Sequence, residues 1–111
     1  MSTQNSVSKK VILERFSLSS EQIESFCRKH HIDRLALFGS VLRDDFTPDS
    51  DIDVLVEFDP DHIPGLITLA GMEIELSELV GGRRVDMKTP LSISRYFRDE
   101  VLEEAETLYV A

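Results

Sequence analysis

The sequence has few of the features that would place a protein in a membrane or in an oxidising compartment. Its single cysteine, Cys27, excludes an internal disulfide framework and is typical of a reducing compartment. No apolar run approaches the ~18 residues that a transmembrane helix needs, and the segment MSTQNSVSKK has no apolar core of the kind that a signal peptide carries. These absences predict a cytoplasmic protein with no membrane partner.

Basic residues are also scarce, because 12 Lys and Arg stand against 21 Asp and Glu, a net charge of −9. Nucleic-acid binding depends on Lys and Arg that neutralise phosphates, so no direct nucleic-acid partner is expected. A phosphate ligand would need cations as mediators. A basic macromolecular partner is compatible with this charge, because opposite fields steer association.

The remaining composition is that of one globular domain: 111 residues, of which 41% are hydrophobic and 30% charged. The polar N-terminal end predicts an extension over residues 1–18 that is partly mobile, followed by a single domain over residues 19–111. Ser19 and Gln22 form a capping box that opens a helix in this domain.

Apolar spacing predicts strands separated by helices. DIDVLVEF alternates strictly and predicts a strand, and LITLAGMEIELSELV has the spacing of a helix. The other expected elements are buried strands in DRLALFGS and RRVDMKT, a helix over most of SISRYFRDEVLEEAETLY, and an edge strand in TLYV. The predicted class is α+β, with helices packed against one small sheet.

Asp51 and Asp53 are the first candidate functional residues. On a strand, their side chains leave the same face with Cα atoms ~7 Å apart, so the carboxylates can share a divalent cation or flank a pair of cations. Oxygen ligands suit Mg²⁺ or Mn²⁺ better than zinc. The same pair alone also fits a solvated strand start. A calcium loop is excluded, because its sixth position would be Val54 in place of Gly and its twelfth Pro60 in place of Glu.

Gly39-Ser40 supports the interpretation of Asp51 and Asp53 as metal ligands. Gly lets a phosphate approach the backbone, Ser40 offers a hydroxyl, and the N–H groups that follow can point at an anion. Gly-Ser at the end of one strand and a carboxylate pair on the next place a phosphate and a cation side by side. Asp86 shares a face of the third expected strand with Arg84 and Lys88. It can complete a three-carboxylate cluster if that strand neighbours the Asp51/Asp53 strand, or it can simply face water.

Gly39-Ser40, ten intervening residues and Asp51-x-Asp53 resemble the signature of the DNA polymerase β-type nucleotidyltransferases. The segments LALFGSVLRDDFTPDSDIDVLVEF, GGRRVDMKTP and YFRDEVLEEAETLY are similar to the minimal nucleotidyltransferases of that superfamily, often called MNT or MntA proteins. The resemblance covers residues 19–109. It implies a small mixed sheet flanked by helices, which is the nucleotidyltransferase core.

The resemblance also implies a function. MntA-like proteins are antitoxins of type VII toxin–antitoxin pairs that move AMP from ATP onto a tyrosine of a HEPN-domain toxin. Carried over to this chain, Gly39, Ser40 and Arg43 would bind the nucleotide. Asp51 and Asp53 would ligate two Mg²⁺ ions, with Mn²⁺ as a substitute. Asp86 would be the third ligand and the candidate base.

The sequence departs from the family pattern at Asp44, where Gly commonly follows the arginine, and this adds negative charge near the expected triphosphate. Two alternatives to protein adenylylation stay open. The chain could be a non-catalytic antitoxin that masks its toxin, or a nucleotidyltransferase that modifies a small molecule.

Overall fold

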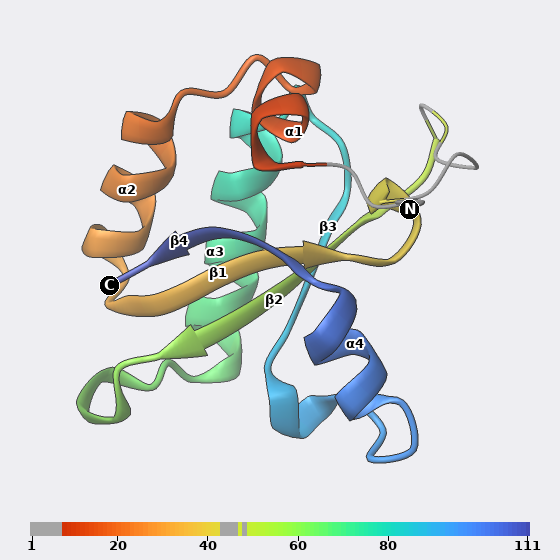
Figure 1. The fold of residues 1–111 in the computed structure, drawn as a ribbon. Helices are drawn as coiled ribbons and strands as arrows, with labels where there is room; N and C mark the ends of the chain where they lie inside the picture. Colours follow the sequence, from red (N-terminus) through yellow and green to blue (C-terminus); the bar gives the residue numbers. More distant parts are fainter. Residues whose placement is uncertain (1–7, 43–46, 48) are drawn as a thin grey trace.

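The computed structural model describes residues 8–42, 47 and 49–111. Figure 1 shows one small sheet with helices on either side of it. In the part of the chain that is described, no helix combines the length and the apolar character needed to cross a membrane. Two residues singled out from the sequence, Arg43 and Asp44, fall outside the described ranges.

The sheet has four strands in the order β3-β2-β1-β4. Strand β1 pairs antiparallel with both β2 and β4, whereas β2 and β3 run parallel, so the sheet is mixed as the family resemblance implied. A parallel pair needs a crossover connection, and helix α3 supplies it. The strands are β1 (Ile32–Phe38), β2 (Ile52–Phe58), β3 (Val85–Lys88) and β4 (Glu106–Val110).

Four α-helices surround the sheet, and short 3-10 turns follow β1, β2 and β3. The helices are α1 (Lys9–Arg15), α2 (Ser20–Lys29), α3 (Leu66–Leu79) and α4 (Arg98–Glu104), and the 3-10 turns are Gly39–Leu42, Pro60–His62 and Pro90–Ser92. The predicted capping box opens α2: Gln22 N–H donates to Ser19 Oγ at 3.1 Å, and Ser19 N–H donates to Gln22 Oε1 at 2.9 Å.

The C-terminal region differs from the sequence expectation. The long helix expected there is reduced to α4, because the preceding residues fold into turns that Arg98 fixes. Its Nε donates to Pro90 O at 2.7 Å and its Nη2 to Ile93 O at 3.2 Å. The expected edge strand is present as β4, antiparallel to β1.

The two faces of the sheet are covered by different helices. Residues Ile52, Val54 and Val56 of β2 enter the main core with side chains of α1, α2 and α3. Leu55 points the other way and packs with Ala36 and Ile93 in a smaller cluster against α4. Figure 1 shows α4 set apart from the other three helices. The alternation predicted for β2 is therefore confirmed, and both of its faces are partly buried.

Helix α1 was not expected from the sequence. It places Ile12 in the main core, and Phe16 and Leu18 follow it there. Arg15 Nη1 also donates to Val41 O at 3.3 Å. The described part of the N-terminal extension therefore packs against the domain, while the predicted boundary at residue 19 stays a prediction.

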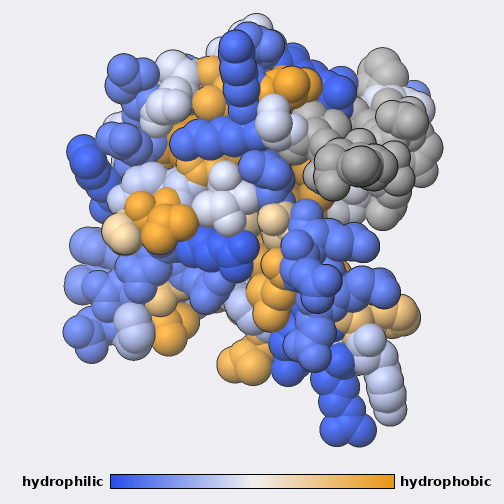
Figure 2. Space-filling view, viewed as in Figure 1, coloured by the Kyte–Doolittle hydropathy of each residue, from blue (hydrophilic) through white to orange (hydrophobic). Residues whose placement is uncertain are grey.

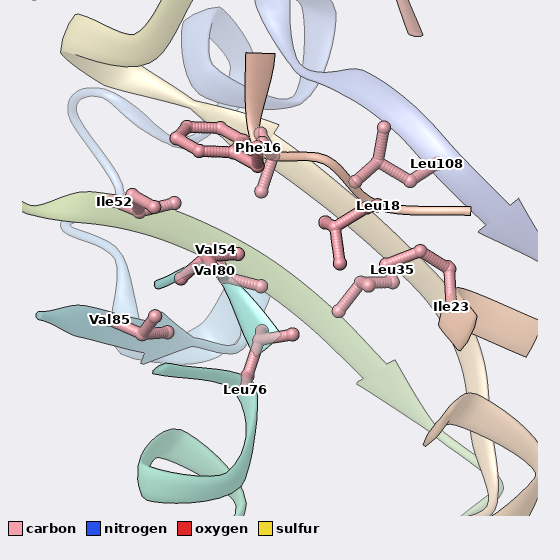
Figure 3. Close-up of a pocket in the computed structure, with 11 residues that line it drawn as sticks. Phe16, Leu18, Ile23, Leu35, Ile52, Val54, Leu76, Val80, Val85 and Leu108 are labelled. Carbon is pink, nitrogen blue, oxygen red and sulfur yellow. The ribbon is translucent and has the colours of Figure 1, made fainter. Parts of the chain in front are cut away.

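The main core is tightly filled. Figure 3 shows apolar side chains of the sheet and the helices, among them Phe16, Leu35 and Leu76, pointing toward one void of about 10 Å³. A void of that size is at the lower limit for a single water molecule, and its walls offer no polar partner. It is a packing gap and not a ligand site.

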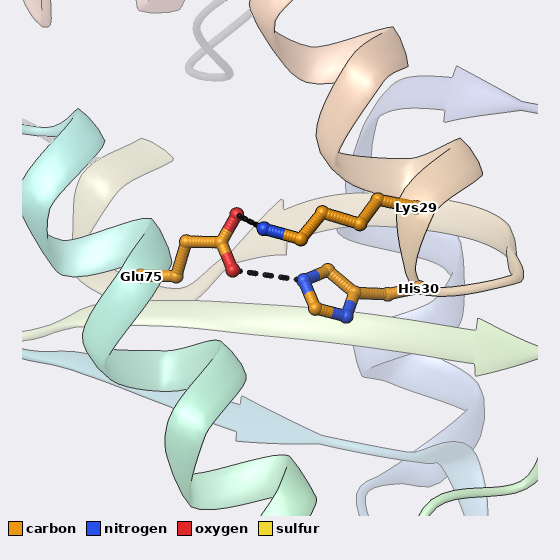
Figure 4. A network of polar contacts seen from close by, with 3 residues as sticks. All are labelled: Lys29, His30 and Glu75. Carbon is orange, nitrogen blue, oxygen red and sulfur yellow. Dashed lines mark hydrogen bonds and ion pairs between the residues drawn. The ribbon is translucent and has the colours of Figure 1, made fainter.

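A polar network joins α2 to α3 on the outer surface (Figure 4). Lys29 Nζ lies 3.0 Å from Glu75 Oε2, and His30 Nε2 lies 2.9 Å from Glu75 Oε1. Burial raises the pKa of the Glu75 carboxyl, but the hydrogen bonds from His30 and Lys29 outweigh this effect, so the pKa lies below its ordinary value.

Candidate active site

The Gly39 turn forms one wall of the site. Gly39 follows the last residue of β1 with a φ of 78°, in the left-handed region that side chains disfavour. A Cβ on this residue would lie 2.5 Å from Asp53 Oδ2. Only glycine lets the Asp53 carboxylate approach the backbone this closely. The sequence singled out Gly39 for approach to phosphate and did not reveal its contact with Asp53.

Asp53 is the best-positioned of the predicted carboxylates. It lies in β2, opposite Phe38 of β1, and its side chain is half-buried. Because Leu55 shares its face, Asp53 belongs to the α4 side of the sheet. Rigid strands on both sides fix its position.

Asp86 lies beside Asp53, as the sequence argument required. Strands β2 and β3 pair in parallel with Asp53 opposite Asp86, so the two backbones are ~4.8 Å apart across the ladder. Lys88 is two residues further along β3 on the same face, and its Nζ lies 3.1 Å from Asp86 Oδ2. The structure therefore brings together Gly39, Asp53 and Asp86, with a lysine beside them.

Asp51 stands slightly apart from this group. Strand β2 begins at Ile52, so Asp51 precedes the strand and is exposed. Its Oδ1 lies 4.0 Å from Arg84 Nε, an exposed pair that contributes little to stability. This geometry places the positive charge of Arg84 beside a carboxylate of the site.

Ser40 is half-buried in the 3-10 turn that begins at Gly39, next to the Asp53 contact. The predicted phosphate-binding role of Ser40 stays a prediction. Arg43, the third predicted nucleotide ligand, and the unusual Asp44 lie outside the described residues.

The donor set suits a hard cation. Among the described residues, no three Asp, Glu, His or Cys side chains are grouped so that they could hold a metal ion as they stand. Asp53 and Asp86 nevertheless share one face, and carboxylate oxygens are the ligands that Mg²⁺ and Mn²⁺ prefer. The missing Cβ of Gly39 lets the Asp53 carboxylate lie directly against the backbone of the turn.

Two supporting residues were not assigned a role from the sequence. Lys88 was recognised only as a neighbour of Asp86 in the strand, and its ion pair required the structure. Glu73 of α3 accepts a hydrogen bond from the Met87 N–H at 2.7 Å, which ties α3 to the strand that carries Asp86. No local sequence pattern announces this long-range contact.

Comparison with known proteins identifies the fold and the family. The family model described as a nucleotidyltransferase domain matches residues 19–108. The "Putative protein adenylyltransferase MJ0435" of Methanocaldococcus jannaschii is 39% identical over 77 residues, which are 69% of this chain and 80% of that protein. The "Protein adenylyltransferase MntA" of Thermococcus cleftensis is 33% identical over 95 residues, covering 78% of this chain and 93% of the relative.

Solved structures of related proteins have the same fold. One described as a "putative minimal nucleotidyltransferase" superposes with a TM-score of 0.66 at 31% identity and covers 89% of this chain and 94% of its own. A toxin–antitoxin solved with AMP-PNP superposes with a TM-score of 0.67 at 21% identity, covers 85% of this chain and 75% of its own, and supports the fold alone. The chain belongs to the nucleotidyltransferase domain family, as a relative of the minimal nucleotidyltransferases and the MntA protein adenylyltransferases.

Proposed function

We propose that this chain, in the cytoplasm, transfers AMP from ATP to a tyrosine hydroxyl of a HEPN-type toxin and is the antitoxin of a type VII pair. One observation carries the proposal: the bare backbone of Gly39 against Asp53, with Asp86 on the adjacent strand. This arrangement sets a turn with no side chain at Gly39 beside two carboxylates that can hold a cation. The names of the MntA relative and of the toxin–antitoxin neighbour support it.

The chain would hold the nucleotide and the cations with separate groups. Gly39 and Ser40 would bind the triphosphate, and Asp51, Asp53 and Asp86 would bind two Mg²⁺ ions, for which Mn²⁺ could substitute. Bound Mg²⁺ would neutralise the triphosphate and lower the pKa of the attacking hydroxyl. Asp86 would exchange its ion pair with Lys88 for this role.

The reaction is a displacement at the α-phosphorus of ATP. The acceptor oxygen forms a bond to that phosphorus, the bond between it and the bridging oxygen of the β-phosphate breaks, and pyrophosphate leaves. The proton of the acceptor hydroxyl passes to Asp86, which lies on the same face as Asp53.

Labelled ATP provides the test. The full chain is incubated with Mg²⁺, ATP and the purified product of the adjacent gene, and an Asp51→Ala/Asp53→Ala variant is compared with Asp49→Ala. Asp49 is an exposed carboxylate just before the site, so its loss controls for charge. Labelling by the unaltered chain and by Asp49→Ala, but not by the double variant, supports the proposal, and equal labelling by all three contradicts it.

A second candidate is a non-catalytic antitoxin that masks the toxin. Its support is the charge balance of the site, where Lys88 already pairs with Asp86 and Arg84 lies near Asp51. Cells that express the toxin distinguish the two. Full protection by Asp51→Ala/Asp53→Ala would favour masking, and loss of protection would favour catalysis.

A further inference from the structure

Helix α3 carries an exposed row of large apolar side chains. Leu66 is 86% exposed, Ile67 91% and Ile74 62%, and Ile63, just before the helix, is 71% exposed. Ala70 is exposed between them. We call these five residues the α3 stripe. Exposed apolar patches larger than a few hundred Å² are uncommon on soluble proteins and usually mark an interaction site.

The other sides of α3 are already occupied. Met72 and Leu76 enter the main core, Glu73 bonds to β3 and Glu75 bonds to α2. At 100° per residue, the stripe residues within α3 (Leu66, Ile67, Ala70 and Ile74) lie opposite the core side chains and face solvent. In Figure 1, strands β1 and β2 pass in front of α3, and the face in Figure 2 is mainly hydrophilic with hydrophobic residues in small separate groups.

The spacing of the stripe suits a helix as its occupant. Within α3, Ile67, Ala70 and Ile74 recur every three or four residues, which is the pattern of a ridge that packs into the groove of another helix. Ala70 and Gly71 are small and lie midway between Ile67 and Ile74. A partner backbone can therefore approach closely at this point.

Charge decides what kind of helix fits. Helix α3 contains three glutamates and no basic residue, and exposed Asp61 and Glu78 stand at the two ends of the stripe. A second copy packed antiparallel would bring Glu78 of one chain toward Asp61 of the other, in a protein of net charge −9. A partner with Lys or Arg beside its apolar face meets complementary charge at both ends.

We infer that the α3 stripe docks an amphipathic helix with a basic border, and that this helix belongs to the protein that accepts AMP. The identity of that protein rests on the proposed function. The location is consistent with it, because β3 is an edge strand and α3 is bonded to it through Glu73. A partner on the stripe that passes around the β3 edge reaches the face that carries Asp86.

Binding of the adjacent gene product to the full chain tests the inference. The dissociation constant is measured by calorimetry for the unaltered chain and for Ile67→Gln/Ile74→Gln, which removes apolar contact without adding charge. Val110→Gln is the matched control, because Val110 is 66% exposed and lies in β4, at the edge of the sheet opposite β3. We expect the stripe variant to bind at least about tenfold more weakly and the control to stay within about twofold.

Glu78→Lys tests the charge argument separately. A lysine suits the last turn of a helix, so the fold is retained, and we expect weaker binding with a smaller salt dependence. Equal binding by the unaltered chain and both α3 variants would overturn the inference and leave AMP transfer untouched. No binding by the unaltered chain would contradict the proposed partner as well. A chain that dimerises alone, and loses the dimer in Ile67→Gln/Ile74→Gln, would show that the occupant is a second copy.

Discussion

Gly39 meets two physical demands at once. Its φ of 78° disfavours any side chain, and the place of a Cβ is taken by the Asp53 carboxylate. The first demand affects stability and the second affects the position of the carboxylate. Substitution at this residue therefore perturbs the fold modestly and the site strongly.

We expect Gly39→Ala to lower the free energy of unfolding by about 1–2 kcal/mol, the strain of a side chain in the left-handed region, and to reduce AMP transfer by at least about tenfold. Gly81→Ala is the control, because Gly81 also has a positive φ, of 80°, but nothing lies within 4 Å of a Cβ there, so it should lose similar stability and keep AMP transfer. Thermal unfolding and labelling check both. Full transfer by Gly39→Ala would show that the Asp53 contact has no role.

Lys88 supplies the positive charge nearest to Asp86 in the described site, with its Nζ 3.1 Å from Oδ2. Without it, Asp86 loses the positive charge beside its carboxylate, so a cation bound there would offset more negative charge. We expect the melting temperature of Lys88→Met in EDTA to be a few degrees lower, because the free energy of unfolding falls by about 0.5–1 kcal/mol. Added Mg²⁺ should raise the melting temperature of Lys88→Met more than that of the unaltered chain. Lys29→Met, which affects only the Glu75 network, should show no change in the Mg²⁺ gain. The same Mg²⁺ gain in Lys88→Met and the unaltered chain would argue against a cation at Asp86.

The contact between helices α2 and α3 depends on the ionised form of Glu75. Its folded pKa lies below the ordinary value of 4.5, so its contribution to stability is present above that pH and is lost as the pH falls through the folded pKa. We expect Glu75→Gln to be less stable than the unaltered chain by about 0.2–1 kcal/mol near pH 6 and the difference to be smaller near pH 3. Melting curves at the two pH values measure this difference in stability. The same difference at both pH values would contradict a lowered pKa of Glu75.

Elements with strong local signals could be predicted from the sequence. The alternation in β2 and the capping box at Ser19 fix backbone geometry within a few residues of themselves. Helix α1 was missed because it is only seven residues long and its burial depends on a distant sheet. Helix α4 is shorter than expected because hydrogen bonds from Arg98 to the preceding turns compete with helical continuation.

The candidate site was likewise predictable only where local spacing determines it. Spacing was sufficient to place Asp53 on the outer face of its strand and to suggest Asp86 as a neighbour, since side chains in a strand alternate with a period of two. It could not reveal that Gly39 contacts Asp53 or that Lys88 pairs with Asp86. Those contacts depend on strand register and rotamers, which are set by the whole sheet.

At the scale of the molecule, the boundary between extension and domain is open to test. Side chains at Ile12, Phe16 and Leu18 are buried, and each contributes about 1.5–3 kcal/mol through removal of apolar surface from water. We expect a chain that lacks residues 1–18 to lose most of its stability, since whole domains have only about 5–15 kcal/mol. Denaturant unfolding measures this, with Ile12→Ala as a milder variant. An unchanged midpoint for the shortened chain would make residues 1–18 a dispensable extension.

The central claim, that the Gly39–Asp53–Asp86 face transfers AMP, is tested most directly by the position of the label in ATP. The full chain, the product of the adjacent gene and Mg²⁺ are incubated with ATP labelled at either the α- or the γ-phosphate, in parallel with Asp53→Asn. We predict that the partner acquires the α-label alone and that Asp53→Asn transfers none. Transfer of the γ-label, or undiminished α-label with Asp53→Asn, would contradict the account.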